Sequence, residues 1–599
     1  MKALTTAQPM HDHHMIFPRL GAYALTTSLL VACASSAAPV DTDVALDGAE
    51  TTASPLDGQQ AGSEGDHAED DGAAERSKPS CSAPATVTPR WYDDAIGYEI
   101  FVRSFRDSDG DGIGDLAGLT ASLDYLNDGD PETTDDLGVT LLWLMPIHQS
   151  PSYHGYDVTD YDRINADYGS EADLNAMLAA AEARGIRVVV DLVLNHSSSE
   201  HPWFLDAKTG PSAAYRHFYV WSDTDLGWSQ PWSSHGTWHP TPSGYYYGLF
   251  WGGMPDLNFG SEAVKATMTQ VARDWLGRGF AGYRLDAVRY LVETGGDEGQ
   301  KDTDETLAYW RRLREATDLV DPESLLLGEA WADSSIVSAY FGTESKPSMH
   351  MAFDFDTASG IETALVTGQG VALRNALCTR LDGWPTHGRA GTFATNHDMR
   401  RLASRLKTQG PDALHLIAAA LMTLPGTPWV YYGQELGLAN GPGSDDIAKR
   451  LPMQWASGPG VGFTEGSPWV PPKSEALKDS VAGQSGDPES LLSRYRDLIA
   501  LRASEPALRR GATRMLSPES TSGGAVAYLR ELEGQRLLVI LNPSREEATV
   551  TLTEDELGDP ALFSEVRHGS SDATASTDDL TLSVTLSAFG YTVLKAATD

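Results

Sequence analysis

A short apolar run at 282–290, with the sequence GYRLDAVRY, places an arginine and a carboxylate two residues apart, at Arg284 and Asp286. Residues two apart on a strand point to the same side. At the carboxyl end of a barrel strand both would face the mouth, where such folds keep their chemistry. A carboxylate beside a guanidinium stays ionised and can act as a nucleophile. The alternative interpretation is an ordinary structural ion pair at a strand end.

Further polar residues follow other apolar runs of the chain. Asp191, Asn195 and His196 end one run, Glu329 follows the run LLLG, and His397 and Asp398 follow FATN. Any one of these could be structural. Three carboxylates, two histidines and an arginine that share one rim predict a catalytic site with acid–base and nucleophilic groups.

Strand-like runs alternate with helical stretches and would position these side chains. Residues 170–185 predict a helix that Ser170 caps and Gly185 ends. Such alternation predicts a parallel sheet with right-handed crossovers, and eight strands are enough to close a (β/α)8 TIM barrel. The eight expected strands lie within 96–105, 139–147, 187–196, 282–286, 325–329, 351–355, 392–396 and 429–432.

The predicted fold class is therefore α/β, with the catalytic barrel spanning 90–510. A long insert rich in Trp, Tyr, Gly and Pro, at 197–259, follows the third strand and is expected to form a B domain. From 511 to 599, short strands separated by turn residues predict a C-terminal antiparallel β-sandwich.

The N-terminal segment resembles an export signal. An apolar stretch after Arg19 ends in LVAC, which resembles a bacterial lipobox, so 1–33 is expected to be a lipoprotein signal peptide with Cys33 as the lipidated residue. Met15 is an alternative start, and an ordinary secretory peptide is the alternative interpretation. Residues 34–89 are rich in carboxylates and small residues and predict a disordered acidic linker.

Composition limits the partners. The formal net charge of -40 argues against nucleic acid, because phosphates would be repelled. The 15 Trp and 22 Tyr residues suit a neutral substrate with sugar rings, although most can simply be core. The three cysteines exclude a disulfide framework, and a bridge between Cys81 and Cys378 is one option.

A stretch of alternating carboxylates and small residues follows the first expected strand. It suits a tight loop around a hard cation such as calcium, but Gly118 stands where an EF-hand needs a bidentate glutamate. A solvated acidic turn is the alternative. The expected ligands are Asp107, Asp109, Asp111, the Ile113 carbonyl and Asp115.

Taken together, the motifs DLVLNH, MPDLN, GYRLDAVRY, GEAW, TNHD and GTPWVYYGQELGL resemble, in the same order, those of the α-amylase family of retaining glycoside hydrolases. The resemblance covers roughly residues 90–599. It implies that Asp286 is the nucleophile, Glu329 the general acid/base and Asp398 the residue that stabilises the transition state. Retention requires two carboxyls about 5 Å apart, one ionised and one protonated. We expect Arg284 to hold Asp286 ionised, and Glu329 to stay protonated in a closed cleft away from cations.

The resemblance also implies which residues bind the sugar and the metal. The 107–115 loop matches the calcium loop of the oligo-1,6-glucosidase-like branch. A second calcium at Asn195 stays open, because Arg289-Tyr290 stands where the family usually has Lys-His. The substrate-binding set is Tyr156, Asp157, His196, Arg284, His397 and Arg401.

The expected substrate is starch and maltooligosaccharides. MPDLN resembles the group between oligo-1,6-glucosidases and neopullulanases, which includes lipoprotein α-amylases, and Ala287 favours α-1,4 bonds. The alternatives are an exo-acting α-glucosidase or oligo-1,6-glucosidase, a trehalose-forming transglycosylase, a non-catalytic surface glycan-binding lipoprotein and a structural subunit. We expect a monomer at the bacterial cell envelope, on the outer membrane or cell surface through lipid at Cys33, or secreted.

Overall fold

The computed structural model describes residues 81–86, 88–443, 445–517, 524–578 and 580–597. The predicted signal peptide, Cys33 and residues 34–80 of the predicted linker lie outside these ranges. Within them, every helix is too short or too polar to cross a membrane.

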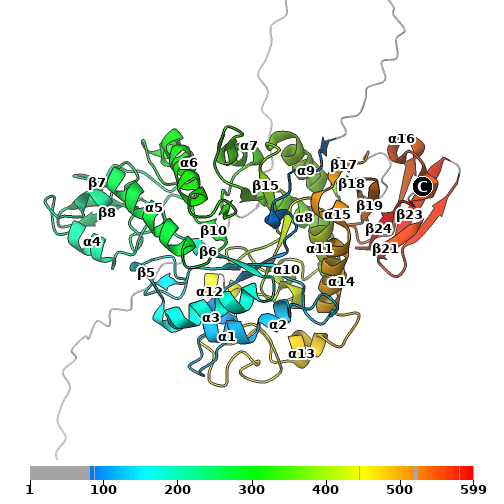
Figure 1. Cartoon of the computed structure of the whole chain (residues 1–599), viewed down its shortest axis with the longest axis horizontal. Helices are drawn as coiled ribbons and strands as arrows, with labels where there is room; N and C mark the ends of the chain where they lie inside the picture. The colour runs from blue at the N-terminus through cyan, green and yellow to red at the C-terminus, as the bar shows by residue number, and fades with distance from the viewer. Residues whose placement is uncertain (1–80, 87, 444, 518–523, 579, 598–599) are drawn as a thin grey trace, which may run out of the picture. The chain divides into compact units, whose positions relative to one another are not determined.

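A closed barrel of eight parallel strands forms the centre of the described chain, which confirms the predicted barrel (Figure 1). The hydrogen-bonded order is β10-β11-β14-β15-β16-β2-β3-β6. The strands are β2 (Gly97–Ile100), β3 (Leu141–Leu144), β6 (Arg187–Leu192), β10 (Gly282–Leu285), β11 (Leu325–Gly328), β14 (Met351–Phe353), β15 (Arg389–Thr392) and β16 (Thr427–Tyr431).

The seventh strand begins and ends earlier than the predicted 392–396. Its register pairs Phe353 of β14 with Gly391, and Phe393 already lies beyond the ladder. Inside the barrel, Gly391 faces the rings of Phe353 and Trp429, and a Cβ there would come within 3.2 Å of both. The barrel interior therefore needs a small residue at this position, whereas the apolar pattern expects a large one. For this reason the predicted strand began and ended too late in the sequence.

The strands are buried on both sides. One face of the barrel wall supplies an inner cluster that includes Trp143, Leu325, Leu327, Phe353 and Trp429. The residues between them, such as Leu326, belong to the larger cluster beneath the helices. This two-sided burial explains why the strands appear in the sequence as continuous apolar runs.

Helices cover the barrel, and neighbours such as α8 and α9, or α5 and α6, pack side by side (Figure 1). The predicted helix at 170–185 is confirmed as α3, which starts after Ser170, whose hydroxyl accepts from the amide of Asp173. The covering helices are α1 (Leu116–Ala121), α2 (Leu123–Leu126), α3 (Glu171–Glu182), α5 (Glu262–Leu276), α6 (Asp304–Asp318), α7 (Ser334–Val337), α8 (Phe355–Thr367), α9 (Val371–Gly383), α10 (Leu402–Arg405), α11 (Pro411–Thr423), α14 (Leu491–Ser504) and α15 (Pro506–Arg510).

The insert after β6 contains a helix, α4 (Pro202–Ala207), and a small antiparallel sheet in the order β7-β9-β8. The sheet strands are β7 (Trp221–Ser222), β8 (Trp238–Thr241) and β9 (Gly244–Tyr247). Its core is aromatic, with Trp238 and Tyr247 buried against Leu249. The insert returns to the barrel through a bridge between His196 and Asp256, which places it beside the ends of the barrel strands.

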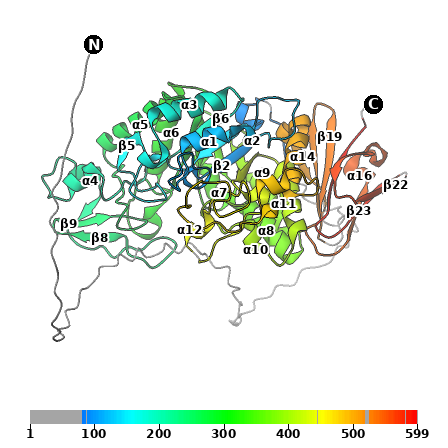
Figure 2. The same cartoon turned by 90° about the horizontal axis from the view of Figure 1, so that it is seen from below.

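Two antiparallel sheets make up the C-terminal part, with β19 and β23 both visible in Figure 2. They share an apolar cluster, as expected for a sandwich. The larger sheet has the order β1-β17-β18-β19-β24-β21, with β1 (Ser82–Ala83), β17 (Ala512–Met515), β18 (Val526–Leu532), β19 (Gln535–Leu541), β21 (Glu565–Gly569) and β24 (Tyr591–Lys595). The smaller has the order β20-β23-β22, with β20 (Ala548–Thr553), β22 (Thr574–Thr577) and β23 (Thr581–Leu586).

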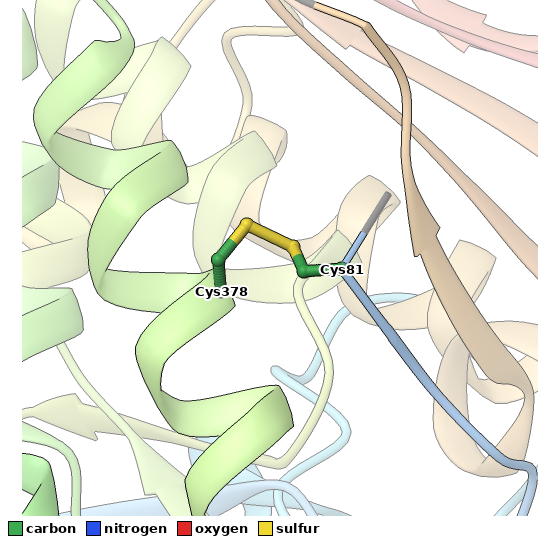
Figure 3. The surroundings of a disulfide bond; sticks show 2 residues. All are labelled: Cys81 and Cys378. Carbon is green, nitrogen blue, oxygen red and sulfur yellow. A yellow bond between two sulfur atoms is a disulfide. The ribbon is translucent and has the colours of Figure 1, made fainter. Parts of the chain in front are cut away.

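The predicted acidic linker at 34–89 ends too late. Ser82–Ala83 forms β1, which pairs with β17 and extends the C-terminal sheet. Just before it, Cys81 forms a disulfide with Cys378 of α9, 297 residues later in the chain (Figure 3). The composition of this stretch gave no sign of order because the order comes from a covalent bond and a strand partner that are distant in sequence.

Candidate active site

The fully buried guanidinium of Arg284 lies at the centre of the predicted site. Arg284 and Asp191 are register partners on the adjacent parallel strands β10 and β6, so their side chains point the same way. Nη1 of Arg284 donates to both carboxylate oxygens of Asp191 at 2.9 Å and to Oδ1 of Asp286 at 2.8 Å. Nη2 lies 2.8 Å from Oε2 of Glu329. One arginine therefore joins three carboxylates from three strand ends.

Asp286 stands just beyond the end of β10, where the backbone turns sharply. The next residue, Ala287, has a φ of 50°, in the left-handed region that non-glycine residues rarely adopt. Its amide donates to Oε2 of Glu329 at 3.4 Å. Such strained positions persist only where their surroundings hold them, and they cluster at active sites.

Glu329 follows β11 and does not lie away from cations as expected, because it contacts Arg284 directly. Burial nevertheless raises the pKa of Glu329 to about 8. The charge of Arg284 lowers this pKa, and the charges of Asp286 and Asp398 offset part of that lowering. We expected Glu329 to stay protonated because no cation would lie nearby. Instead, burial and the two neighbouring carboxylates raise its pKa although a cation is in contact. At neutral pH the Glu329 carboxyl holds a proton.

Asp398 and His397 form an ion pair after β15. Nε2 of His397 lies 3.0 Å from Oδ2 of Asp398, and Nδ1 lies 2.6 Å from Oε1 of Glu99 on β2. Burial lowers the pKa of His397, but these two carboxylates raise it to about 9, so the ring is charged at neutral pH. Burial likewise opposes ionisation of Asp398, yet His397 and Arg450 hold its pKa well below its usual range.

Tyr156 connects the two halves of the site. Its hydroxyl lies 2.8 Å from Nε2 of His397 and donates to Oδ2 of Asp191 at 3.0 Å. The Tyr156 and His397 rings are nearly parallel, at 13° with centroids 5.7 Å apart. A continuous polar chain therefore runs from Glu99 through His397 and Tyr156 to Asp191 and Arg284.

The remaining predicted sugar-binding residues lie on both sides of this chain. Burial lowers the pKa of His196 to about 4, so its ring is neutral, and it contacts Phe250 of the insert. Asp157 accepts hydrogen bonds from Ser150, at 2.6 Å, and from Ser152. These contacts fix the orientation of both side chains, and their contacts with substrate stay predictions.

Arg401 is held against the backbone. The side chain is 1% exposed and donates to the carbonyls of Lys449 and Tyr432, both at 2.7 Å. Its contact with substrate stays a prediction. The arginine that reaches Asp398 is Arg450, whose Nη2 lies 2.8 Å from Oδ1.

Sequence reasoning missed Glu99, Arg450 and Lys449 as members of the site. The Lys449 ammonium donates to the carbonyl of Asp398 at 2.8 Å. Glu99 lies within the apolar strand β2. A single carboxylate in a buried strand was the signal that could have identified it as a site residue. Lys449 ends the short helix α12 (Asp446–Lys449) and Arg450 follows it, in a stretch that carries no motif, so no signal in the sequence pointed to this pair.

The predicted metal loop brings together three of its carboxylates. Ligand atoms of Asp107, Asp109 and Asp115 all lie within 4.8 Å of one another, whereas Asp111 is not part of this group. Burial would raise the pKa of Asp107, but hydrogen bonds from Thr464 and from backbone amides lower it, so the carboxylate is ionised. Three carboxylate oxygens at this spacing suit a hard cation.

Asn195, predicted as a ligand of a second calcium, donates to Oδ2 of Asp256 at 2.9 Å. Burial raises the pKa of Asp256 to about 8, so that carboxyl is neutral at pH 7. This hydrogen bond uses the Nδ2 of Asn195, whereas its buried Oδ1 has no hydrogen-bond partner in the described part of the chain, so the second calcium at Asn195 stays a prediction.

Arg289 and Tyr290 lie at the rim of the site. Arg289 forms an ion pair with Asp302 and donates to the carbonyl of Trp331 at 2.5 Å. Tyr290 packs against Trp232 and Phe250 of the insert. Trp331, two residues after Glu329, is stacked on Phe355 and is 43% exposed, so one face of its indole is open beside the acid.

The comparisons with known proteins agree with this geometry. The family model described as alpha amylase, catalytic domain, matches residues 99–511, and a model of the alpha-amylase SusG C-terminal domain matches 525–590. Alpha-amylase 3 of Dictyoglomus thermophilum is 32% identical over 471 residues, which cover 78% of this chain and 88% of the relative. The trehalose synthase/amylase TreS of Mycolicibacterium smegmatis is 33% identical, covering 74% and 81%. The crystal structure of an alpha-amylase from H. orenii matches with a TM-score of 0.74 and 34% identity, covering 84% of this chain and 99% of that chain.

Proposed function

We propose, from the premise that this chain belongs to the α-amylase family of glycoside hydrolases (glycoside hydrolase family 13), that it hydrolyses α-1,4-glucosidic bonds in starch, maltodextrins and maltooligosaccharides with retention. The observation that carries this proposal is the pair of carboxyls on one guanidinium. Asp286 and Glu329 lie 2.8 Å from different amino groups of Arg284. They are therefore close neighbours, as retaining glycosidases require.

The first step uses the two carboxyls in different roles. Asp286 attacks the anomeric carbon while Glu329 gives its proton to the departing glycosidic oxygen, which leaves a glycosyl ester on Asp286. Glu329 suits the acid role because burial raises its pKa to about 8. Asp286 suits the nucleophile role because Arg284 donates to its Oδ1, which fixes the direction of the carboxylate.

The second step reverses these roles. The Glu329 carboxylate removes a proton from water, the water oxygen bonds to the anomeric carbon, and Asp286 leaves. Asp398, held ionised by His397 and Arg450, is placed to bind sugar hydroxyls and stabilise positive charge on the ring. Tyr156, whose hydroxyl is held by His397 and Asp191, is proposed to contact the sugar in the cleaved subsite.

The rim supports binding of a longer chain. The exposed indole of Trp331, two residues after the proton donor Glu329, offers a stacking surface for a sugar ring. Arg289 holds the Trp331 carbonyl and takes no part in substrate binding in this proposal. An aromatic platform near the proton donor favours a leaving group that is itself a sugar chain.

The pH dependence follows from the acid. Because Glu329 must be protonated to donate, we expect kcat/KM to fall about tenfold per pH unit above pH 8. Initial rates on maltoheptaose between pH 6 and 10 measure this limb, with circular dichroism as the control for unfolding. A rate that is flat to pH 10 would contradict the proposed acid.

A second candidate is a trehalose-forming transglycosylase or an exo-acting α-glucosidase on the same scaffold. It is favoured by relatives such as TreS and by Maltase A1 of Drosophila melanogaster, which is 31% identical and covers 79% of this chain. Both candidates would use the same glycosyl ester and differ in the acceptor and in the depth of the pocket.

Maltoheptaose separates the candidates in one experiment. Products of intermediate length from mid-chain cuts are expected for the α-amylase. Stepwise release of glucose would indicate the α-glucosidase, and conversion of maltose to trehalose the transglycosylase. Release of reducing sugar from soluble starch, compared between the wild type and Glu329→Gln, excludes a mere glycan-binding protein.

We also propose that the 107–115 loop holds a calcium ion for stability. Chelation with EDTA is expected to lower the unfolding temperature by several degrees, since a ligand at a hundred times its Kd contributes about 2.7 kcal/mol. Calcium should restore it. Asp109→Asn should reduce this response because Asp109 belongs to the close carboxylate group, whereas its neighbour Asp111→Asn is the matched control. An equal reduction of the calcium response in both variants would indicate that Asp111 is also a ligand.

Export to an oxidising compartment remains our proposal for location. The Cys81–Cys378 disulfide supports it, because such bonds persist outside the cytosol. With these two cysteines paired, Cys33 stays available for the lipid that the LVAC motif predicts. Radiolabelled palmitate incorporation, compared with Cys33→Ser, tests the anchor.

A further inference from the structure

A cavity of about 600 Å³ lies at the other end of the barrel from the proposed catalytic residues. Its wall includes residues that precede barrel strands, such as His350 before β14 and Gly426 before β16. It also includes Ala83 of β1 and Arg530 of β18, so the barrel, the N-terminal strand and the C-terminal sheet meet there. The disulfide of Figure 3 is adjacent, because Cys81 and Cys378 each precede a wall residue by two positions.

Arginines dominate the wall of this cavity in a chain whose formal charge is -40. Among the described residues, the wall contains a single carboxylate residue, Glu344. The arginines are Arg90, Arg314, Arg380, Arg389, Arg509, Arg510 and Arg530. Six of them have acidic partners behind the wall, and two of these six, Arg509 and Arg510, share Asp94.

Arg530 is the exception. It is 1% exposed, and its guanidinium donates to the carbonyls of Thr423 and Gly511, at 3.0 and 3.3 Å. In the described part of the chain it has no carboxylate partner, and its Nε has no hydrogen-bond partner. A buried, uncompensated guanidinium is costly unless an anion accompanies it. Burial and the nearby charge of Arg380 lower its pKa to about 10, which reflects the missing anion.

The neutral groups of the wall also offer donors. Nδ1 of His350 accepts the amide hydrogen of Leu326 at 3.1 Å, so the ring proton must be on Nε2. Burial, with Arg314 and Arg90 nearby, keeps the pKa of His350 well below its usual range, so the ring is neutral. A wall that offers many donors and one carboxylate suits neither a metal cation nor a neutral glucan, but it suits an oxyanion.

We propose that this cavity binds a phosphoryl dianion, as inorganic phosphate or as a phosphate monoester. The anion would lie between Arg530 and the guanidiniums of Arg509 and Arg510, which share Asp94. Several planar guanidiniums match the geometry of phosphate oxygens. The bound anion would join α9, the barrel floor and β18, beside the disulfide. We therefore expect bound phosphate to stabilise the folded protein and to leave catalysis at the opposite end of the barrel unchanged.

Calorimetric titration of the full chain with inorganic phosphate, in a non-phosphate buffer at constant ionic strength, tests the proposal. Wild type should bind saturably with one-to-one stoichiometry. Arg530→Gln should weaken binding at least about tenfold, the loss of one charge-assisted contact. Because the buried variant can fail to fold, Arg510→Gln at the partly exposed edge is the second variant and should also weaken binding. Arg312→Gln, a surface arginine on α6, is the matched control and should not.

A parallel titration with glucose 6-phosphate distinguishes the two sources, since tighter binding than phosphate identifies an ester ligand. Asp286→Asn should bind phosphate as the wild type does, which separates this site from the proposed glycosidase activity. The proposal is overturned if wild type shows no saturable phosphate binding, or if Arg510→Gln and the Arg312→Gln control bind with the same affinity as wild type.

Discussion

Asp286→Asn and Glu329→Gln are each expected to fold normally and to lose nearly all hydrolysis of maltooligosaccharides. Asp286→Asn removes the nucleophile, and the loss should be at least about 10⁴-fold in kcat. Glu329→Gln removes the proton donor, and the loss should be about 10²–10⁴-fold. Both changes keep the size of the side chain, so the barrel should not need to repack. Rates on maltoheptaose and circular dichroism spectra provide the measurements.

The leaving group separates the two roles. An aryl maltoside with an acidic phenol needs little proton donation, so Glu329→Gln should recover glycosylation on this substrate, whereas Asp286→Asn should stay inactive. Glu315→Gln makes the same chemical change on the exposed face of α6 and should leave kcat within twofold of wild type. Normal turnover by either active-site variant would refute the assignment, and equal recovery by both would refute the division of roles.

Arg284→Gln should combine loss of activity with loss of stability. Removal of this guanidinium leaves the carboxylates of Asp191 and Asp286 buried without their shared cation and removes a contact of the protonated Glu329. Breaking a buried ion pair on one side costs about 3–5 kcal/mol in the free energy of unfolding. Activity should fall with it, because Asp286 loses the donor that orients it. Urea unfolding at pH 7 measures the first effect and kcat the second.

The destabilisation by Arg284→Gln should depend on pH. Without the cation, folding raises the pKa values of the buried carboxyls, so the folded state binds more protons than the unfolded state and stability falls as pH rises. The loss relative to wild type should therefore be larger at pH 7 than at pH 5. Arg312→Gln breaks an exposed ion pair with Glu262 and should cost less than about 1 kcal/mol. An equally small loss in Arg284→Gln would show that the three carboxylates do not depend on this arginine.

Much of the fold was predictable from local patterns. Continuous apolar runs marked seven of the barrel strands close to their observed positions, because strands covered on both sides need apolar residues at every position. The seventh strand, at Arg389–Thr392, escaped because the barrel interior needs Gly391 beneath Trp429 and Phe353. The strand at Ser82–Ala83 escaped because its partner, β17, is more than 400 residues away.

For the site, local sequence shows which residue types follow each strand, and parallel topology requires those strand ends to meet. This brings Asp286, Glu329 and Asp398 to one rim. Their electrostatics depend on the folded arrangement. It placed Glu329 against Arg284 and still raised its pKa, turned Arg401 toward backbone carbonyls, and supplied Glu99 and Arg450 to the His397–Asp398 pair. A protonation state depends on burial and on charges from distant segments, and neither is encoded in the spacing of any one motif.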